Sequence, residues 1–426
     1  MLLTLYKFAM QASTPLLEAY LQKRARRGKE DVARAGERRG MAGLKRPAGA
    51  LLWFHAASVG ESLSLLAIIS RILNDNPGAT ALVTTGTVTS AKLMAERLPQ
   101  GAFHQYMPVD HPAWVKKFLD HWQPDFVFWS ESEFWPNMLG EIRRRHIPAV
   151  LLNARMSEQS FRNWRHARGM IREILSAFDL CLGQNASEAA RLTALGAKDA
   201  RVSANVKYAA APLPYDAAAL EALQLAAAGK KLVLFASTHA GEEEIAFEAH
   251  QRLQQKHPGL VTVIVPRHAV RGAEIQALAA KRGITAGLRS AHASFENIYI
   301  ADTMGELGLF YRLCPLAVVG GSFADIGGHN PIEPGQLGCI IVYGPEMYNF
   351  VTINDDFLGA KAALQVADTA ALEATLDDIL SKPESYARYG AAAKAMTLQK
   401  QNVVDELAAT LQPYLDRALH KTGAAA

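Results

Sequence analysis

With 426 residues, the chain is too long for one ordinary hydrophobic core and is expected to form two domains. Half of its residues are hydrophobic and 20% are charged, which is typical of a soluble globular protein. The net charge of +4 is unevenly distributed, because residues 22–46 contain ten Lys or Arg and only three Asp or Glu. The rest of the chain is therefore slightly acidic, which argues against a nucleic-acid-binding surface spread over the fold.

The first 21 residues are mostly apolar, with polar residues at positions 4, 7, 11, 14 and 18. This spacing predicts a helix with a narrow polar stripe, which suits a membrane interface better than a membrane span. The basic residues that follow favour contact with an anionic cytoplasmic leaflet. A tilted span and an ordinary buried helix with a solvated basic tail are the alternatives. Without a small-residue cleavage site, a secretory signal is not expected.

From residue 50 onward, apolar strands alternate with helical patterns. Strands are predicted at 50–56, 80–87, 124–131, 147–155 and 180–185. Helices are predicted after the first two strands, through Leu73 and Arg97, and at 136–145 and 187–196. Strands that are hydrophobic on both faces and separated by helices indicate a parallel sheet covered by helices on either side. The first half is therefore expected to be one doubly wound α/β domain.

An Ala-rich connector with two prolines covers residues 208–230, and a second alternating series follows it. Its strands are predicted at 231–237, 260–266, 297–302, 315–323 and 338–344. Two doubly wound halves leave a cleft lined by the carboxyl ends of strands, where ligands bind in such folds. The expected division is an N-terminal membrane-associating segment at 1–40, domains at 41–210 and 211–383, and a helical segment at 384–426 that packs back across both.

The sequence lacks the motifs of several common kinds of functional site. Cys181, Cys314 and Cys339 lie in or beside apolar runs and are expected to be reduced core thiols. The sequence has no D-x-D triplet, no His/Cys cluster with metal spacing, no G-x-S-x-G and no P-loop lysine. A nucleotide-handling enzyme of this kind would stabilise its leaving group with a helix dipole, Arg and Lys.

In the first half, Glu61 stands where an apolar strand gives way to a helix. Amides at the helix start would keep its carboxylate ionised at neutral pH, without a raised pKa. A capping role and a role as a catalytic base are both open. His55 is a rival base but lies within the strand. Glu131 and Glu133 would point the same way if their strand continues past them. Lys207 lies near the end of the first domain, where a lysine either faces solvent or neutralises a leaving phosphate.

In the second half, the segment Gly305–Gly308 opens a helix after a strand and could let a phosphate approach backbone amides, although such a G-x-x-G pattern alone is usually a plain turn. Arg267 follows a strand and could pair with a nucleotide, or form a surface ion pair. Asn330 and Glu333 lie in a Gly/Pro-dense turn, where the carboxylate suits ribose hydroxyls or caps a helix near Pro334. The glutamates 242 to 244 are most simply first-turn charges.

Seven blocks occur in an order that resembles the bacterial 3-deoxy-D-manno-octulosonic acid (Kdo) transferases. They are "HAASVGE", "SESEFWPN", "NVKY", "STHAGEEE", "VPRH", "DTMGELG" and "GGSF…GGHNPIEP". The resemblance runs from the N-terminus to about residue 350. It implies an α/β fold of the GT-B type, with two Rossmann-like domains facing each other across a cleft. It also implies a metal-independent, inverting glycosyltransferase without a cofactor.

The family resemblance implies transfer of Kdo from CMP-Kdo to a lipid A precursor, the tetraacyldisaccharide 4'-bisphosphate, with release of CMP. The reaction would take place at the cytoplasmic face of the inner membrane, in lipopolysaccharide biosynthesis. The match makes Glu61 the catalytic base and gives Glu131 and Lys207 a role in stabilising the transition state. The residues that match the family's CMP contacts are Pro266, Arg267, Met304, Gly305, Glu306, Asn330, Pro331, Ile332 and Glu333.

Two rival functions remain at this stage. A nucleotide-sugar 2-epimerase would share the fold but would need no hydrophobic N-terminus. A non-catalytic nucleotide-binding scaffold would tolerate any residue at position 61. The basic segment 153–172 could contact lipid phosphates through Arg155, Arg162, Arg165, Arg168 and Arg172, and a solvated helix face is an equally good interpretation.

Overall fold

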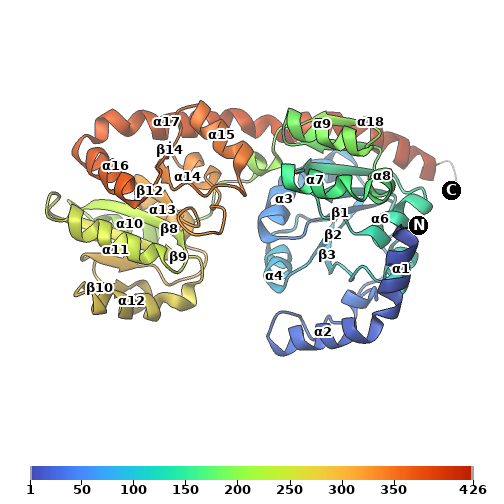
Figure 1. The fold of residues 1–426 in the computed structure, drawn as a ribbon, viewed down its shortest axis with the longest axis horizontal. Coiled ribbons are helices and arrows are strands. Elements are labelled where there is room, and N and C mark those ends of the chain that lie inside the picture. Colours follow the sequence, from blue (N-terminus) through green and yellow to red (C-terminus); the bar gives the residue numbers. More distant parts are fainter. Residues whose placement is uncertain (1, 424–426) are drawn as a thin grey trace. The chain divides into compact units, whose positions relative to one another are not determined.

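The computed structural model describes residues 2–423, which divide into two compact units (Figure 1). The first unit comprises residues 1–210 together with 401–426, and the second comprises residues 211–400. Each unit contains one seven-stranded sheet in which all pairings between strands are parallel. The alternation of strands and helices in the sequence therefore correctly indicates two doubly wound α/β domains.

The sheet of the first unit has the strand order β3-β2-β1-β4-β5-β6-β7. Its strands are β1 (Leu51–His55), β2 (Thr80–Thr85), β3 (Ala102–Tyr106), β4 (Phe126–Ser130), β5 (Ala149–Ala154), β6 (Leu180–Gly183) and β7 (Ala200–Val202). The helices of this unit are α1 (Leu2–Ala12), α2 (Thr14–Arg26), α3 (Val59–Asp75), α4 (Val88–Arg97), α5 (Pro112–Trp122), α6 (Pro136–Arg144), α7 (Glu158–Arg165), α8 (Arg168–Leu175), α9 (Ala186–Leu195) and α18 (Val403–Gly423).

Both faces of this sheet are buried. Leu51 and Trp53 point to the face covered by α5, α6 and α8, while Leu52 and Phe54 point to the face covered by α3 and α18. Because side chains alternate along a strand, burial on both sides requires the continuous apolar run seen in the sequence. This core fixes the carboxyl ends of β1 and β4 beside each other.

The sheet of the second unit has the order β10-β11-β9-β8-β12-β13-β14. Its strands are β8 (Lys231–Thr238), β9 (Leu260–Pro266), β10 (Ala286–Leu288), β11 (Ile298–Ile300), β12 (Leu316–Val319), β13 (Ile340–Tyr343) and β14 (Leu364–Gln365). Its helices are α10 (Ala217–Ala226), α11 (Glu242–Leu253), α12 (Gly272–Lys281), α13 (Leu307–Leu313), α14 (Ile332–Gln336), α15 (Val351–Gly359), α16 (Thr369–Ser381) and α17 (Pro383–Gln399).

Each sheet contains a strand-order reversal beside the strand that comes first in the chain. In the first unit it lies between β1 and β4, and in the second it lies between β8 and β12. In doubly wound sheets, the loops that leave these neighbouring strands diverge to opposite faces and open a crevice, where ligands bind. The loops after β1, β4, β8 and β12 are therefore the first places to look for a functional site.

The N-terminal segment forms two short helices in place of one long helix. The first helix, α1, packs against α5 and α6, and the Tyr6 hydroxyl donates to Asp110 over 3.1 Å. Across the described part of the chain, no helix combines the length and the apolar character that a membrane span requires. The large apolar side chains of Leu5, Phe8 and Leu16 are exposed on α1 and α2.

The C-terminal helical segment is divided between the two units. Helix α17 packs on α14 and β13 of the second unit, whereas α18 packs on α3 of the first. Leu407, Leu411 and Leu415 of α18 are buried in the same cluster as Phe54. As far as residue 423, the helical segment predicted to pack across both domains therefore consists of two helices with different cores.

Candidate active site

Glu61 lies in the first turn of α3, directly after β1. Ser58 is the N-cap of this helix, and its hydroxyl accepts from the Glu61 backbone N–H over 3.3 Å. The Glu61 carboxylate in turn accepts the Ala57 N–H over 2.9 Å and the Ser58 hydroxyl over 2.7 Å. The S-x-x-E pattern thus forms a capping interaction, as one of the two interpretations predicted. Capping does not exclude catalysis, because each carboxylate oxygen can accept a second hydrogen bond.

The environment of Glu61 corrects one expectation from the sequence. Burial raises the pKa of Glu61, and the negative charge of Glu131 raises it further. The hydrogen bonds from Ser58 and Ala57 act in the opposite direction without cancelling these effects. The prediction that helix-start amides would leave the pKa unraised was therefore wrong, because it ignored burial beside a second carboxylate.

Glu131 follows β4, on the other side of the strand-order reversal. The strand ends at Ser130, and Glu131 has a φ of +55°. The strand therefore does not continue to Glu131 and Glu133, so the condition under which the two side chains would point the same way is not met. Glu133 instead accepts a hydrogen bond from the indole of Trp135 over 3.2 Å. A non-glycine residue held at positive φ is strained, and such strain collects at functional sites.

Lys207 forms an ion pair with Glu131. The Lys207 Nζ lies 2.9 Å from Oε1 of Glu131, and both side chains are only 17% exposed. Lys207 belongs to a short 3₁₀ turn, Val206–Ala209, which Asn205 caps by accepting the Lys207 N–H. The structure therefore brings Glu61, Glu131 and Lys207 to one edge of the first sheet, although they are far apart in the sequence.

Asn153 is a site residue that the sequence analysis did not identify. Its side-chain amide donates to Oε1 of Glu131 over 3.4 Å and accepts the Val206 N–H over 3.3 Å. Asn153 has a φ of +52° at a register shift between β5 and β6. It therefore connects the loop of Glu131 with the turn of Lys207. An Asn within the apolar run "IPAVLLNAR" was the available signal.

The rival base His55 lies in the hydrophobic core. Its Nδ1 is 3.0 Å from the Thr84 hydroxyl, and its ring contacts Trp129. Burial lowers the pKa of His55 to about 3, so the ring is neutral. A side chain enclosed in this way cannot reach an acceptor hydroxyl, so Glu61 stays the predicted base.

In the second unit, Arg267 and Glu333 are brought near one another. Pro266 ends β9, and Arg267 follows with an exposed side chain. Burial raises the pKa of Glu333 to about 7, while Asn330 and the charge of Arg267 counteract this effect. The Asn330 amide donates to Glu333 over 3.4 Å. The N-cap position of α14 is Pro331, so Glu333 lies in the first turn and does not cap the helix.

The predicted segment Met304–Glu306 lies after β11, which is separated from the strand-order reversal by β9. Glu306 immediately precedes α13, and its carboxylate accepts from Arg289 over 3.0 Å and from the Thr303 hydroxyl. Gly305 has a φ of +82°, which glycine adopts without strain. A negative charge therefore stands at the start of this seven-residue helix.

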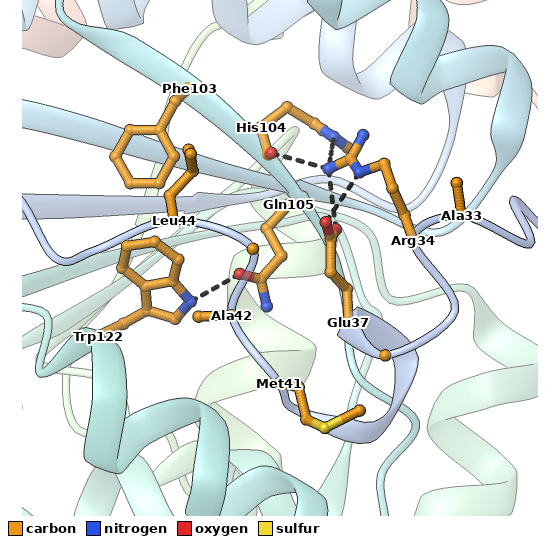
Figure 2. Close-up of a pocket in the computed structure, with 12 residues that line it drawn as sticks. Ala33, Arg34, Glu37, Met41, Ala42, Leu44, Phe103, His104, Gln105 and Trp122 are labelled. Carbon is orange, nitrogen blue, oxygen red and sulfur yellow. Dashed lines mark hydrogen bonds and ion pairs between the residues drawn. The ribbon is translucent and has the colours of Figure 1, made fainter.

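A pocket of about 490 Å³ lies elsewhere on the first unit, between residues 33–44 and the edge strand β3 (Figure 2). Arg34 contacts Glu37 and His104 there, and the Trp122 indole donates to Gln105 over 2.8 Å. Its wall also includes Met41, Leu44 and Phe103. None of the predicted site residues lines this pocket.

Within residues 2–423, no group of three His, Cys, Asp or Glu side chains is placed so that it could hold a metal ion. Cys181, Cys314 and Cys339 are buried and free, as predicted.

Comparison with known proteins identifies the family. Residues 33–210 match the family model described as 3-deoxy-D-manno-octulosonic-acid transferase (kdotransferase). The 3-deoxy-D-manno-octulosonic acid transferase of Rickettsia bellii is 31% identical over 410 residues, which cover 95% of this chain and 98% of that protein. The transferase of the same name from Haemophilus influenzae is 30% identical, with 86% and 87% covered.

The solved structures show the fold. The UDP-GlcNAc 2-epimerase of Neisseria meningitidis, bound to UDP-GlcNAc, aligns with a TM-score of 0.58 over 86% of this chain and 100% of that chain, at 13% identity. The architecture is therefore of the GT-B type, with two Rossmann-like domains. At this identity the likeness concerns the fold alone, whereas the two sequence relatives described above are named as transferases. The chain belongs to the family of 3-deoxy-D-manno-octulosonic acid (Kdo) transferases and is a glycosyltransferase.

Proposed function

We propose that this Kdo transferase takes Kdo from CMP-Kdo and adds it to a lipid A precursor, the tetraacyldisaccharide 4'-bisphosphate, with release of CMP. Membership of the family supports transfer of Kdo. The observation that carries the mechanism is the arrangement of Glu61, Glu131 and Lys207 at the strand-order reversal of the first sheet.

In this mechanism Glu61 acts as the general base. A hydroxyl of the acceptor attacks the anomeric carbon of Kdo and transfers its proton to the Glu61 carboxylate. The bond between the anomeric carbon and the phosphate oxygen breaks, and its electron pair leaves with CMP. The raised pKa of Glu61 makes its carboxylate a stronger base than an exposed glutamate, which favours proton transfer. Attack opposite the leaving group inverts the anomeric centre.

Glu131 and Lys207 would act on the charges that develop in the transition state. The anomeric carbon becomes positive as CMP departs, and a fixed carboxylate stabilises that charge when the site excludes water. Lys207 balances Glu131 in the resting state and is held within 2.9 Å of it. Both groups are mostly buried, so their geometry is set before substrate binds.

The donor nucleotide would bind to the second unit. Arg267 supplies a positive charge at the end of β9, and Glu333 with Asn330 supplies groups that suit ribose hydroxyls. A carboxyl with a pKa of about 7 exists in both protonation states at neutral pH, so Glu333 can donate or accept a hydrogen bond. The proposed reaction requires neither a metal ion nor a cofactor.

The N-terminal segment would anchor the enzyme to the cytoplasmic face of the inner membrane, where the lipid acceptor resides. Phe8 and Leu16 are 72% and 74% exposed, which is unusual for large apolar side chains and favours a lipid partner. Lys23, Arg26, Arg27 and Lys29 follow in exposed positions. Exposed Arg162, Arg165, Arg168 and Arg172 of α7 and α8 could contact lipid phosphates as well.

The test is a transfer assay with the purified full chain in detergent, CMP-Kdo and the tetra-acylated lipid A precursor, with EDTA present. Mass spectrometry should show that the glycolipid has gained the mass of one or more Kdo units. One CMP should be released for each Kdo that is transferred. Transfer that depends on added divalent metal would contradict the metal-independent mechanism. An enzyme that is silent with this donor and acceptor, but active with another pair, would contradict the assigned substrates.

A further inference from the structure

Two histidines meet at the strand-order reversal of the second sheet. His239 follows β8, and His329 lies in the loop between β12 and α14. The two Nε2 atoms are 2.9 Å apart, and the ring planes differ by only 7°. Because β8 and β12 are neighbours at the reversal, this contact joins the two loops that leave them, which is where doubly wound sheets generally bind ligands.

The contact requires the rings to share one hydrogen. An N–H···N bond forms when one Nε2 carries a proton and the other does not, so at most one of the two rings is charged when they are paired in this way. Burial lowers the pKa of His239, and burial lowers that of His329 to about 4. The ring that accepts through Nε2 must carry its own proton on Nδ1, which leaves one N–H group free to turn toward a ligand.

The charges around the pair are mainly positive. Arg267, Arg271 and His268 disfavour a charge on His239, whereas Glu242 favours one. The charges of Arg267 and His268 also lower the pKa of His329. The Arg271 guanidinium is already paired with Glu243 over 2.7 Å. Among the described residues, no carboxylate forms an ion pair with Arg267, so its charge is available to an anion.

The loop that carries His329 is fixed by a buried carboxylate. Glu242 accepts the N–H groups of His239, Gly321 and Phe323 over 2.9, 2.7 and 3.1 Å. A side chain at Gly321 would stand 3.1 Å from the His329 ring, at a φ of +67° that favours glycine. The glutamates 242 to 244, which the sequence assigned to the helix dipole alone, therefore include the residue that positions the histidine pair.

We propose that His239 and His329, together with Arg267, form the subsite that holds the phosphate of the donor nucleotide. This inference rests on the proposed use of CMP-Kdo and adds two residues to the donor site. Protonated or neutral imidazole and guanidinium groups all donate to phosphate oxygens. The helix start at Gly305, which the sequence also offered for a phosphate, is less suitable because the Glu306 carboxylate stands there.

Calorimetric titration of the full chain with CMP and with cytidine tests this subsite. His329→Leu and His239→Leu should each weaken CMP binding at least tenfold and leave cytidine binding unchanged, because cytidine lacks the phosphate. His329→Gln, which retains one donor, should weaken CMP binding less. His292→Asn changes an exposed histidine elsewhere on the same unit and should have no effect. An equal loss for CMP and cytidine, or no loss for either, would overturn the inference.

A second measurement does not depend on folding of the variants. In wild-type protein, the imidazole nitrogen resonances of His239 and His329 should shift when CMP is added and stay in place when cytidine is added. Unshifted resonances in the presence of bound CMP would overturn the subsite and leave the proposed donor intact. If wild-type protein binds no CMP at all, the proposed donor fails, and the subsite fails with it.

Discussion

The Nζ of Lys207 lies 2.9 Å from Oε1 of Glu131, and the amide of Asn153 donates to the same oxygen over 3.4 Å. Glu131 and Asn153 both have positive φ values. Because strained backbone persists only where surrounding contacts hold it, Lys207, Glu131 and Asn153 form a cluster whose geometry the fold enforces. Glu61 lies across the strand-order reversal from this cluster, and the charge of Glu131 raises its pKa.

The pH dependence of transfer should report this coupling. A base acts when deprotonated, so kcat/KM should fall as the pH decreases through the pKa of Glu61, which lies above the ordinary value for a glutamate. The fall of kcat/KM at low pH is the acid limb of the profile. Glu131→Gln removes the nearby negative charge, so this acid limb should move to lower pH. The variant should also have a lower rate. An acid limb that stays in place in the variant would show that the two carboxylates do not interact.

Asn153 should act as a positioning residue. Asn153→Gly keeps the positive φ without strain and removes the amide, so we expect kcat to fall about tenfold, the worth of one lost hydrogen bond. The KM for CMP-Kdo should be unchanged, because the donor site lies in the second unit. Asn153→Asp places a carboxylate beside Glu131 and should move the acid limb of kcat/KM to higher pH.

The same series separates positioning from folding. Thermal unfolding should give similar midpoints for wild type and Asn153→Gly, since the glycine relieves strain while a hydrogen bond is lost. If Asn153→Gly and Asn153→Asp leave both kcat and the pH profile unchanged, Asn153 has only a structural role in β5.

Ser58→Ala should affect both stability and chemistry. The substitution removes the N-cap of α3 and is expected to cost about 1 kcal/mol of unfolding free energy. It also removes the hydroxyl that donates to Glu61 over 2.7 Å, so the acid limb of kcat/KM should move to higher pH. Denaturant titration and the pH profile measure the two effects separately. Loss of stability with an unshifted profile would limit Ser58 to capping.

The membrane proposal predicts that Phe8→Ser with Leu16→Ser weakens binding to anionic phospholipid vesicles by at least tenfold. Burying two such side chains contributes on the order of 3 kcal/mol. Leu225→Ser is the matched control, because Leu225 of α10 is 74% exposed, as is Leu16. CMP binding should be unchanged in both variants. If the double variant binds vesicles as strongly as the control, the membrane contact does not depend on Phe8 and Leu16.

The alternation of apolar strands and helices was sufficient to predict two doubly wound domains, but not every strand. The edge strand β3 was not predicted, because its residues His104 and Gln105 interrupt the apolar pattern. The edge strands β7, β10 and β14 have only two or three residues each, which is too short for a recognisable apolar pattern, and they were not predicted. Central strands are buried on both faces and show a continuous apolar run, whereas edge strands are partly exposed.

The family resemblance identified Glu61, Glu131 and Lys207, and the fold brings them together. The ion pair and the role of Asn153 could not be predicted, because both depend on the turn of the chain after β4 and on the register shift in β5. The direction of the Glu61 pKa shift was missed because a sequence does not show which carboxylates are buried side by side. His239 and His329 are 90 residues apart and are joined only by the order of the strands.

The most direct test of the account compares wild type with Glu61→Gln in the transfer of Kdo from CMP-Kdo to the lipid A precursor, with CMP affinity measured on the same preparations. Gln preserves the size of the side chain and removes the base. The account predicts a fall in kcat of about 10²- to 10⁴-fold with CMP affinity unchanged. A fully active Glu61→Gln enzyme would contradict base catalysis by Glu61 and leave Glu61 as the cap of α3.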